Sequence, residues 1–340
     1  MTPRIIIESN IPFAKGLLDH AATVSYLPPQ EITPESMRHT DALITRTRTR
    51  CDSALLDGSQ CSIIASATIG LDHVDLGYCR ANGIEVANAP GGNAPAVAQY
   101  VMASIIAAYG ADSLAGLTIG IVGVGHVGQI VERWARQLGM SVLLCDPPRA
   151  EKEGSDIFCP LDRIAREADI ITFHTPLTKE APHPTYHLAD ESFFRTLARK
   201  PMVINAARGP IVDTPALINA MDNGLVSHAV IDCWEGEPNI SMPLLKKAFV
   251  ATPHIAGYSR QGKIRATEMA IAAVGRKFNI EPRPMTKTAP DGAASHVTAH
   301  EIAASYDPLA DTAALRHDPS QFEALRNNYN LRDETGCATN

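Results

Sequence analysis

LTIGIVGVGHVGQIVERWARQLGMSVLLCD, residues Leu117–Asp146, is the most informative stretch of the chain. The apolar run 118–122 predicts a buried parallel strand, which leads directly into a G-x-G-x-x-G turn. In such a turn the first glycine permits a tight bend, the second lets the backbone approach a pyrophosphate, and the third lets a helix pack close to the strand. We therefore expect a dinucleotide phosphate at the N-terminus of the next helix. The residues predicted to contact it are Gly123, Gly125, His126, Val127 and Gly128.

The residues after the glycine turn complete the pattern of a dinucleotide-binding unit. Apolar residues recur at helical spacing over 127–138, Gly139 predicts the end of the helix, and a second apolar run covers 141–145. Asp146 then stands roughly twenty residues beyond the turn, where a carboxylate binds the adenosine ribose hydroxyls. An acid at that place repels a 2′-phosphate, so the predicted cofactor is NAD rather than NADP. The surrounding strand, helix and acid argue against a plain turn.

The composition limits the classes of protein to which the chain can belong. Its 340 residues predict about two domains, and 45% hydrophobic with 20% charged residues is ordinary for a soluble globular protein. A formal net charge of -7 provides no global basic surface for nucleic acid or membrane. No apolar run has the length of a signal or membrane-spanning segment. We therefore expect a cytoplasmic protein with a small-molecule substrate.

The cysteines give no sign of a disulfide framework or a metal centre. The seven cysteines are an odd number and include no C-x-x-C pair. Structural zinc sites and disulfide scaffolds both rely on closely spaced pairs. We therefore expect free thiols and no metal cofactor.

The N-terminal region predicts a second α/β domain. Apolar runs predict strands at 4–8, 41–45, 61–67 and 84–87, and residues 11–20 predict a helix. Arg46 stands at the carboxyl end of the strand 41–45, where α/β sheets place their ligands, and is the candidate for binding an anion. Arg48 and Arg50 follow at alternate positions, and a role as solvated surface charges is an equal alternative for them.

The region after Asp146 continues the alternation of strand and helix. Strands are expected at 169–173, 201–205, 227–231 and 249–252, and each ends in polar residues or glycine. The carboxyl ends of parallel strands line one crevice, so side chains far apart in sequence can converge there. Those expected to converge are Asp146, Thr175, Arg208, Asp232, Glu237 and His254.

The predicted fold class is α/β, with two doubly wound, Rossmann-like parallel-sheet domains and a small C-terminal dimerisation segment. A long apolar helix from residue 96 to 109 leads from the first domain into the second, and prolines and glycine near 280–293 predict a linker. The tail is too short for a core of its own and is expected to pack on a partner chain or on the body. The predicted boundaries are 1–95 with 258–280 for substrate binding, 96–257 for NAD binding, and 287–340 for dimerisation.

Several motifs together resemble the D-isomer-specific 2-hydroxyacid dehydrogenase family over residues 1–280. Besides the glycine turn, they are Asn-Ala-Ala-Arg-Gly at 205–209 with Asp213, Asp-Cys-Trp-Glu-Gly-Glu-Pro at 232–238, and Pro-His-Ile-Ala-Gly at 253–257. Further stretches resemble the branch of that family that oxidises 4-phosphoerythronate in vitamin B6 synthesis. These stretches are 144–150, 173–177, 187–191 and 322–329, together with Trp234.

The resemblance implies a role for each matching residue. His254 is the implied proton donor and acceptor, Glu237 its carboxylate partner, and Arg208 the anchor of the substrate. Thr47, Thr68 and Tyr258 match substrate-contacting positions. The positions that match nucleotide contacts are Asp146, Thr175, Ala206, Ala207, Arg208, Asp232 and Gly257. A homodimer is implied as well.

Hydride transfer from a secondary alcohol needs the groups that this set supplies. It needs a base for the hydroxyl proton, a cation that holds the carboxylate, and a nicotinamide beside the reacting carbon. Two alternatives remain: another D-2-hydroxyacid dehydrogenase, acting on 3-phosphoglycerate or an unphosphorylated acid, or a regulatory protein that senses NADH on the same fold. The presence of Arg208, Glu237 and His254 together argues against a pure sensor.

Overall fold

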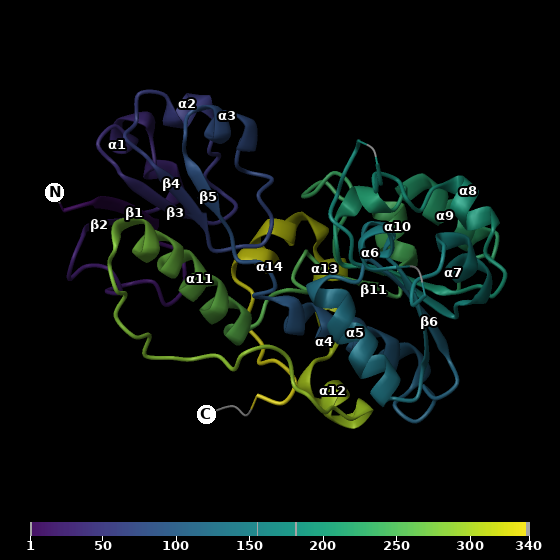
Figure 1. The fold of residues 1–340 in the computed structure, drawn as a ribbon. Helices are drawn as coiled ribbons and strands as arrows, with labels where there is room; N and C mark the ends of the chain where they lie inside the picture. The colour runs from purple at the N-terminus through teal and green to yellow at the C-terminus, as the bar shows by residue number, and fades with distance from the viewer. Residues whose placement is uncertain (1, 155, 181, 338–340) are drawn as a thin grey trace. The chain divides into compact units, whose positions relative to one another are not determined.

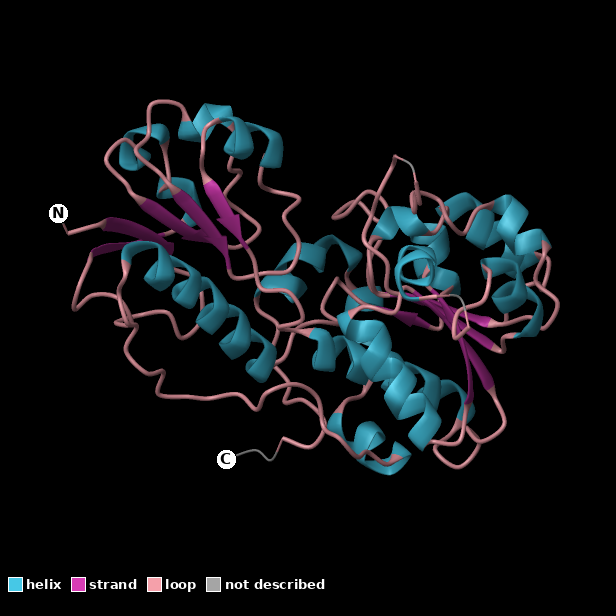
Figure 2. Cartoon of the chain, in the orientation of Figure 1, coloured by secondary structure: helices cyan, strands magenta, loops and turns pink. Residues whose placement is uncertain are grey.

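The computed structural model of the chain describes residues 2–154, 156–180 and 182–337. The chain divides into two compact units, Met1–Asn93 with Ser259–Gly292 and Ala94–Tyr258 with Ala293–Asn340. Each unit is built on its own sheet, as the colouring by secondary structure shows (Figure 2). Residues 338–340 of the predicted dimerisation segment lie outside the described residues.

The first unit contains a five-stranded parallel sheet in the order β2-β1-β3-β4-β5. Its strands are β1 (Arg4–Glu8), β2 (Thr23–Leu27), β3 (Ala42–Thr45), β4 (Ile63–Ser66) and β5 (Glu85–Ala87). Its helices are α1 (Pro34–Met37), α2 (Ser53–Leu56), α3 (Leu76–Ala81) and α11 (Arg260–Phe278), with a 3-10 turn at Pro29–Glu31. The short helices cover one face of the sheet and α11 covers the other (Figure 1).

Both faces of this sheet are buried, which explains its continuous apolar strands. Ile5 of β1 belongs to the core that includes Val274 of α11, whereas the next residue, Ile6, belongs to the core that includes Met37 of α1. Successive side chains of a strand point to opposite faces, so a strand covered on both sides has no polar face. The predicted strands 4–8, 41–45 and 61–67 are confirmed for this reason. The predicted strand 84–87 is confirmed as β5, although it is a partly exposed edge strand.

Two features of the first unit differ from the prediction. The prediction of a helix at 11–20 is wrong. These residues form turns and bends, in which Gly16 has φ +87°. Ile11 and Leu18 are nevertheless buried in the core, so the apolar spacing reflects packing without a helix. Strand β2 was not predicted, since it lies at the sheet edge and its side chains are partly exposed.

The second unit contains a six-stranded parallel sheet in the order β11-β10-β9-β8-β6-β7. Its strands are β6 (Thr118–Val122), β7 (Ser141–Cys145), β8 (Ile170–Phe173), β9 (Met202–Asn205), β10 (His228–Ile231) and β11 (Val250–Ala251). The helices before and between them are α4 (Ala94–Tyr109), α5 (His126–Gln137), α6 (Pro147–Glu153), α7 (Leu161–Glu167), α8 (Glu191–Arg195), α9 (Thr214–Asp222) and α10 (Met242–Lys247), with a 3-10 turn at Gly209–Ile211. The predicted fold class of two doubly wound parallel sheets is confirmed.

The strand order reverses at one place in each sheet. In the second unit β6 lies between β7 and β8, and in the first unit β1 lies between β2 and β3. Ligands of open α/β sheets bind at the carboxyl ends of strands beside such a reversal. Gly123 follows β6, and Arg46 follows β3, so both predicted binding elements lie at these places.

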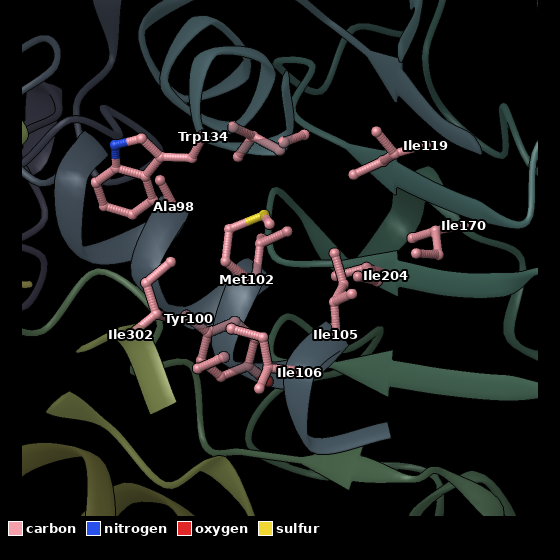
Figure 3. Close-up of a cluster of buried hydrophobic side chains, with 14 of the residues drawn as sticks. Ala98, Tyr100, Met102, Ile105, Ile106, Ile119, Trp134, Ile170, Ile204 and Ile302 are labelled. Carbon is pink, nitrogen blue, oxygen red and sulfur yellow. The ribbon is translucent and has the colours of Figure 1, made fainter. Parts of the chain in front are cut away.

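The C-terminal residues pack on the second unit. They form α12 (Ala299–Ser305), α13 (Pro308–His317) and α14 (Phe322–Asn327), with a 3-10 turn at Pro319–Gln321. Ile302 of α12 joins a buried cluster with Tyr100 of α4, Trp134 of α5 and Ile119 of β6 (Figure 3). The segment is thus an integral part of this unit's core, and its role in dimerisation stays a prediction. No helix of the described residues is long and apolar enough to cross a membrane.

Candidate active site

The glycine turn has the geometry that its sequence predicts. Gly123 has φ +90°, and a Cβ at Gly128 would come within 2.2 Å of the Gly123 carbonyl oxygen. Residues with a side chain rarely adopt the positive φ of Gly123, and the close approach at Gly128 leaves room only for a hydrogen atom. At Gly125 a Cβ would meet no atom within 4 Å, so the backbone there is open to a ligand. Helix α5 begins at the next residue, His126.

Asp146 lies beside this turn at the end of β7. Its Oδ2 accepts a hydrogen bond of 2.8 Å from the N–H of Val124, and its Oδ1 accepts one of 3.1 Å from Arg149 as the N-cap of α6. The Arg149 guanidinium is held in turn by Glu153 and by the carbonyl of Val124. The carboxylate is therefore fixed next to the glycine turn, as a ribose ligand must be.

Thr175 lies on the neighbouring strand end and has an unused polar atom. Its Oγ1 is buried and has no hydrogen-bond partner within the described part of the chain. A buried hydroxyl without a partner is costly and calls for one from outside the protein. A Cβ at Gly123 would lie 2.9 Å from Cγ2 of Thr175, so the Thr175 side chain lies directly beside the glycine turn. These observations fit a bound dinucleotide.

The loops after β9, β10 and β11 are joined by hydrogen bonds. The N–H of Asp232 and that of Cys233 donate to the carbonyl of Asn205, whose side-chain amide donates to the carbonyl of Arg208. Gly209 is needed here, because a Cβ would come within 2.0 Å of the Trp234 carbonyl oxygen. The loop after β9, which carries Arg208, and the turn after β10, which carries Glu237, are thus held together by hydrogen bonds.

Asp232 holds the loop that carries His254. It is 1% exposed, and its Oδ1 accepts hydrogen bonds of 2.7 Å from both the Thr252 hydroxyl and the N–H of Ile255. Its Oδ2 accepts a third bond, of 3.0 Å, from the N–H of Ala256. His254 has φ +57°, a conformation that costs a non-glycine residue on the order of 1–3 kcal/mol. The buried carboxylate of Asp232 compensates for that strain. A contact between Asp232 and the nucleotide stays a prediction.

His254 and Glu237 form the central pair of the site. The Nδ1 atom of His254 lies 2.8 Å from Oε2 of Glu237, and the other oxygen of Glu237 accepts from the N–H of Trp234. Burial lowers the pKa of His254, but its contacts with Cys233 and with the Glu237 carboxylate outweigh burial and raise the pKa well above its usual value. Burial likewise raises the pKa of Glu237, and its hydrogen bond with His254 reverses the shift, so the net pKa is lowered. The pair is therefore a carboxylate that stabilises a protonated imidazole.

Helix α14 adds a third charged group that the sequence did not predict. Nη1 of Arg326 lies 3.8 Å from Oε2 of Glu237, and its Nε donates a bond of 3.4 Å to the hydroxyl of Tyr258. The Tyr258 ring also packs edge-on against Tyr329, with centroids 6.2 Å apart. Arg326 thus links the predicted substrate residue Tyr258 to the acid–base pair.

Arg332 stabilises the same region from the end of the chain. Its guanidinium donates to the carbonyls of Ala96 and Tyr258 at 3.1 and 3.0 Å and also to those of Ile255 and Ala256. The carbonyls belong to the start of α4 and to the loop beyond His254. No sequence pattern predicts these contacts, because they join segments that are distant in the chain.

Arg46 of the first unit lies at the β1–β3 reversal, directly after Thr45, which contacts a buried acid. Glu8 is 0% exposed, and its Oε1 accepts hydrogen bonds from the hydroxyls of Thr45 and Thr49. Nη1 of Arg46 donates a long bond of 3.4 Å to the carbonyl of Asn10, and its Nε is buried without a hydrogen-bond partner among the described residues. A buried guanidinium N–H without a partner fits an anionic ligand.

Thr47 and Thr68 also belong to the first unit. Thr47 is exposed, and the Thr68 hydroxyl lies 2.7 Å from that of Ser66 and 3.1 Å from the carbonyl of Gly70. His73 lies in the following loop, and burial lowers its pKa. The predicted roles of these threonines in substrate binding stay predictions.

The chain matches known proteins along its length. Residues 93–256 match the family model described as D-isomer specific 2-hydroxyacid dehydrogenase, NAD binding domain, so NAD as cofactor is confirmed for the family. The chain is 47% identical over 337 residues to an erythronate-4-phosphate dehydrogenase of Bacteroides thetaiotaomicron, with 97% of each chain covered. It is 43% identical to one of Porphyromonas gingivalis, which covers 96% of this chain and 92% of that protein.

The structural comparison agrees with the sequence comparison. A crystal structure of D-lactate dehydrogenase from Aquifex aeolicus, complexed with NAD and lactic acid, covers 81% of this chain and 95% of that chain with a TM-score of 0.68. At 23% identity this likeness shows a common fold. Fold, family model and full-length relatives lead to one assignment: the chain belongs to the D-isomer specific 2-hydroxyacid dehydrogenases, within their group of erythronate-4-phosphate dehydrogenases.

Proposed function

We propose that the protein oxidises 4-phospho-D-erythronate with NAD to (R)-3-hydroxy-2-oxo-4-phosphooxybutanoate, a step in pyridoxal 5′-phosphate synthesis. The relatives at 47% and 43% identity carry the name of this activity over nearly their whole length. The observation that carries the proposal within this chain is the 2.8 Å contact between His254 and Glu237, on a sheet edge with an open glycine turn.

The roles proposed for the side chains follow from their chemistry. His254 accepts the proton of the C2 hydroxyl as the C2 hydrogen leaves as hydride, and Glu237 stabilises the imidazolium that forms. Arg208 binds the carboxylate of the substrate and polarises the developing carbonyl. NAD, when bound, supplies the hydride acceptor.

The cofactor contacts follow the glycine turn and the neighbouring strand ends. The pyrophosphate is proposed to meet the turn and the start of α5 at His126 and Val127, with Asp146 on the ribose. The unused hydroxyl of Thr175 supports a contact with the same ligand. The further proposed contacts are Ala206, Ala207, Arg208, Asp232 and Gly257.

The distal phosphate of the substrate is assigned to Arg46, with Thr47 beside it, and Thr68 and Tyr258 complete the proposed substrate contacts. The buried Nε of Arg46 that has no partner among the described residues supports this assignment. Arginine suits a phosphate because its planar fork of donors makes charge-assisted bonds.

Assembly and location are part of the same proposal. We assign a homodimer to residues 287–340, as the resemblance to the family implies. A cytoplasmic location is supported by the free cysteines of the described residues, which suit a reducing compartment.

The test is turnover of the purified protein with NAD and a panel of acids, followed as NADH formation. Our proposal predicts the highest kcat/KM for 4-phospho-D-erythronate, well above 3-phosphoglycerate and unphosphorylated erythronate. A preference for 3-phosphoglycerate would assign the chain to another substrate of the family. NADH binding without turnover of any acid would favour the sensor.

A further inference from the structure

Three potential metal ligands converge in the loops after β10 and β11. One ligand atom each of Cys233, Glu237 and His254 lies within 4.8 Å of the other two. Cys233 is 2% exposed, and its Sγ lies 3.4 Å from the carbonyl of Ala207. In the proposed dehydrogenase reaction the thiol does no more than contact His254 and raise its pKa, so its place beside the acid–base pair leaves room for a further role.

These side chains are the ligand types that zinc prefers in proteins. Thiolate, imidazole and carboxylate bind Zn²⁺ at about 2.0–2.3 Å with tetrahedral geometry, which separates the ligand atoms by roughly 3.4–3.6 Å. The 2.8 Å between His254 and Glu237 must therefore open slightly, and each ligand atom starts within 4.8 Å of the other two. These movements are on the order of an ångström, within the reach of side-chain rotation.

The charges around the three ligands favour a divalent cation. Glu237 carries a negative charge, and the carboxylate of Asp232 lies 4.0 Å from Sγ of Cys233. Arg326, 3.8 Å from Glu237, opposes the cation but contributes a single positive charge. The side chains of His254 and Glu237 are 28% and 19% exposed, so an ion can enter from their side and reach the buried thiol.

We propose that Cys233, Glu237 and His254 form an inhibitory site for Zn²⁺ and related thiophilic cations. Binding replaces the thiol proton of Cys233 and the ring proton of His254 by the metal, and both protons pass to solvent. A fourth position stays open for water, as in zinc sites with three protein ligands. The metal then occupies the nitrogen lone pair of His254 and the Glu237 oxygen that would stabilise the imidazolium.

The inhibitory part of this inference rests on the proposed function, whereas the binding part does not. Cysteine spacing gives no signal for this site, because its ligands come from separate loops that meet only in the fold. Metal binding is therefore measured directly, independently of turnover.

The experiment starts from a C159S/C337S background, since these are the two cysteines of the chain that are not buried. Titration with Cd²⁺ reports thiolate coordination by its ultraviolet charge-transfer band, and equilibrium dialysis with Zn²⁺ gives the stoichiometry. We expect about one equivalent per chain and a band that the C233S variant lacks. E237Q keeps the thiol and should weaken binding on the order of 100-fold, because loss of even an outer-shell partner costs 10–100-fold.

Activity is then measured with Zn²⁺ in the same background, with recovery on addition of EDTA. The C233S variant, checked for native folding by circular dichroism, should tolerate Zn²⁺ at concentrations at least about tenfold higher. Equal Cd²⁺ bands with and without Cys233, unchanged affinity in E237Q, or no stoichiometric binding would overturn the proposed site. If the protein oxidises no acid but still binds the metal through Cys233, the proposed function fails and the site stands.

Discussion

Nη1 of Arg326 lies 3.8 Å from the Glu237 oxygen that also faces Nδ1 of His254. The C-terminal helix α14 therefore contributes a charge to the acid–base pair. A positive charge at this distance favours the ionised carboxylate, on which the stabilisation of a protonated His254 depends.

Removing that charge should reduce catalysis without abolishing it. We expect R326Q to lower kcat/KM by about tenfold, because Glu237 loses a positive neighbour and Tyr258 loses a hydrogen-bond donor. R326K, which keeps the charge, should recover part of the loss. Steady-state kinetics of both variants provide the measurement, and wild-type kinetics in R326Q would limit Arg326 to packing.

The pH dependence of oxidation should report the pKa of His254. Oxidation needs the neutral imidazole. Because the pKa of His254 is raised above the usual histidine value of 6.5, the ring stays protonated at pH values above 6.5. The rate should therefore rise with pH, with the acid limb of kcat/KM centred above 6.5. Removing the carboxylate charge in E237Q should move this limb to lower pH as well as reduce kcat.

Glu235 offers a matched control for this shift. It stands two residues from Glu237 in the chain, but its carboxylate contacts His187 and the N–H of Thr214. E235Q should leave the acid limb where it is. Equal displacement in E235Q and E237Q would show that a general field, and not the contact with His254, sets the pKa.

Cofactor choice should depend on the charge of Asp146. D146N keeps one oxygen, which can accept from the N–H of either Val124 or Arg149 but not both, and it removes the charge that repels a 2′-phosphate. We expect the ratio of kcat/KM for NAD over NADP to exceed unity in the wild type and to fall by about tenfold or more in D146N. Kinetics with both cofactors provide the test. Better use of NADP by the wild type would refute the assignment.

Arg46 should distinguish a phosphorylated from an unphosphorylated substrate. R46K should lower kcat/KM for 4-phosphoerythronate, and R46A should lower it further, by about 100-fold, while unphosphorylated erythronate is affected much less. R50A is the matched control, because the 79% exposed Arg50 side chain is already paired with Asp52 at 2.6 Å. Equal losses for both substrates would make Arg46 structural, and the phosphate would then be sought at Arg48 or a partner's C-terminal segment.

The sequence predicted those parts of the fold that burial makes obvious. Strands such as β6, covered on both faces, are continuous apolar runs, and the cluster around α5 follows its helical spacing. The edge strand β2 has a half-exposed pattern that resembles a loop. The apolar spacing over 11–20 packs against the core from turns, and periodicity alone does not distinguish the two.

The candidate site shows the same division. His254 and Glu237 lie in local motifs at strand ends, where the fold class itself predicts convergence. Arg326 and Arg332 act through contacts with segments far away in the chain, and the thiol of Cys233 becomes a candidate ligand only when two loops meet. Such contacts depend on tertiary packing, which no local pattern encodes.

Transfer of the C2 hydrogen tests the central claim most directly. The protein is incubated with NAD and 4-phospho-D-erythronate deuterated at C2, and the reduced cofactor and the organic product are analysed by mass spectrometry. We predict that the reduced nicotinamide carries the deuterium, that the product is the 2-oxo acid with its phosphate intact, and that H254A forms both slower by about 10²–10⁴. Reduced cofactor without deuterium, or H254A turnover at the wild-type rate, would contradict hydride transfer from C2 with His254 as the base.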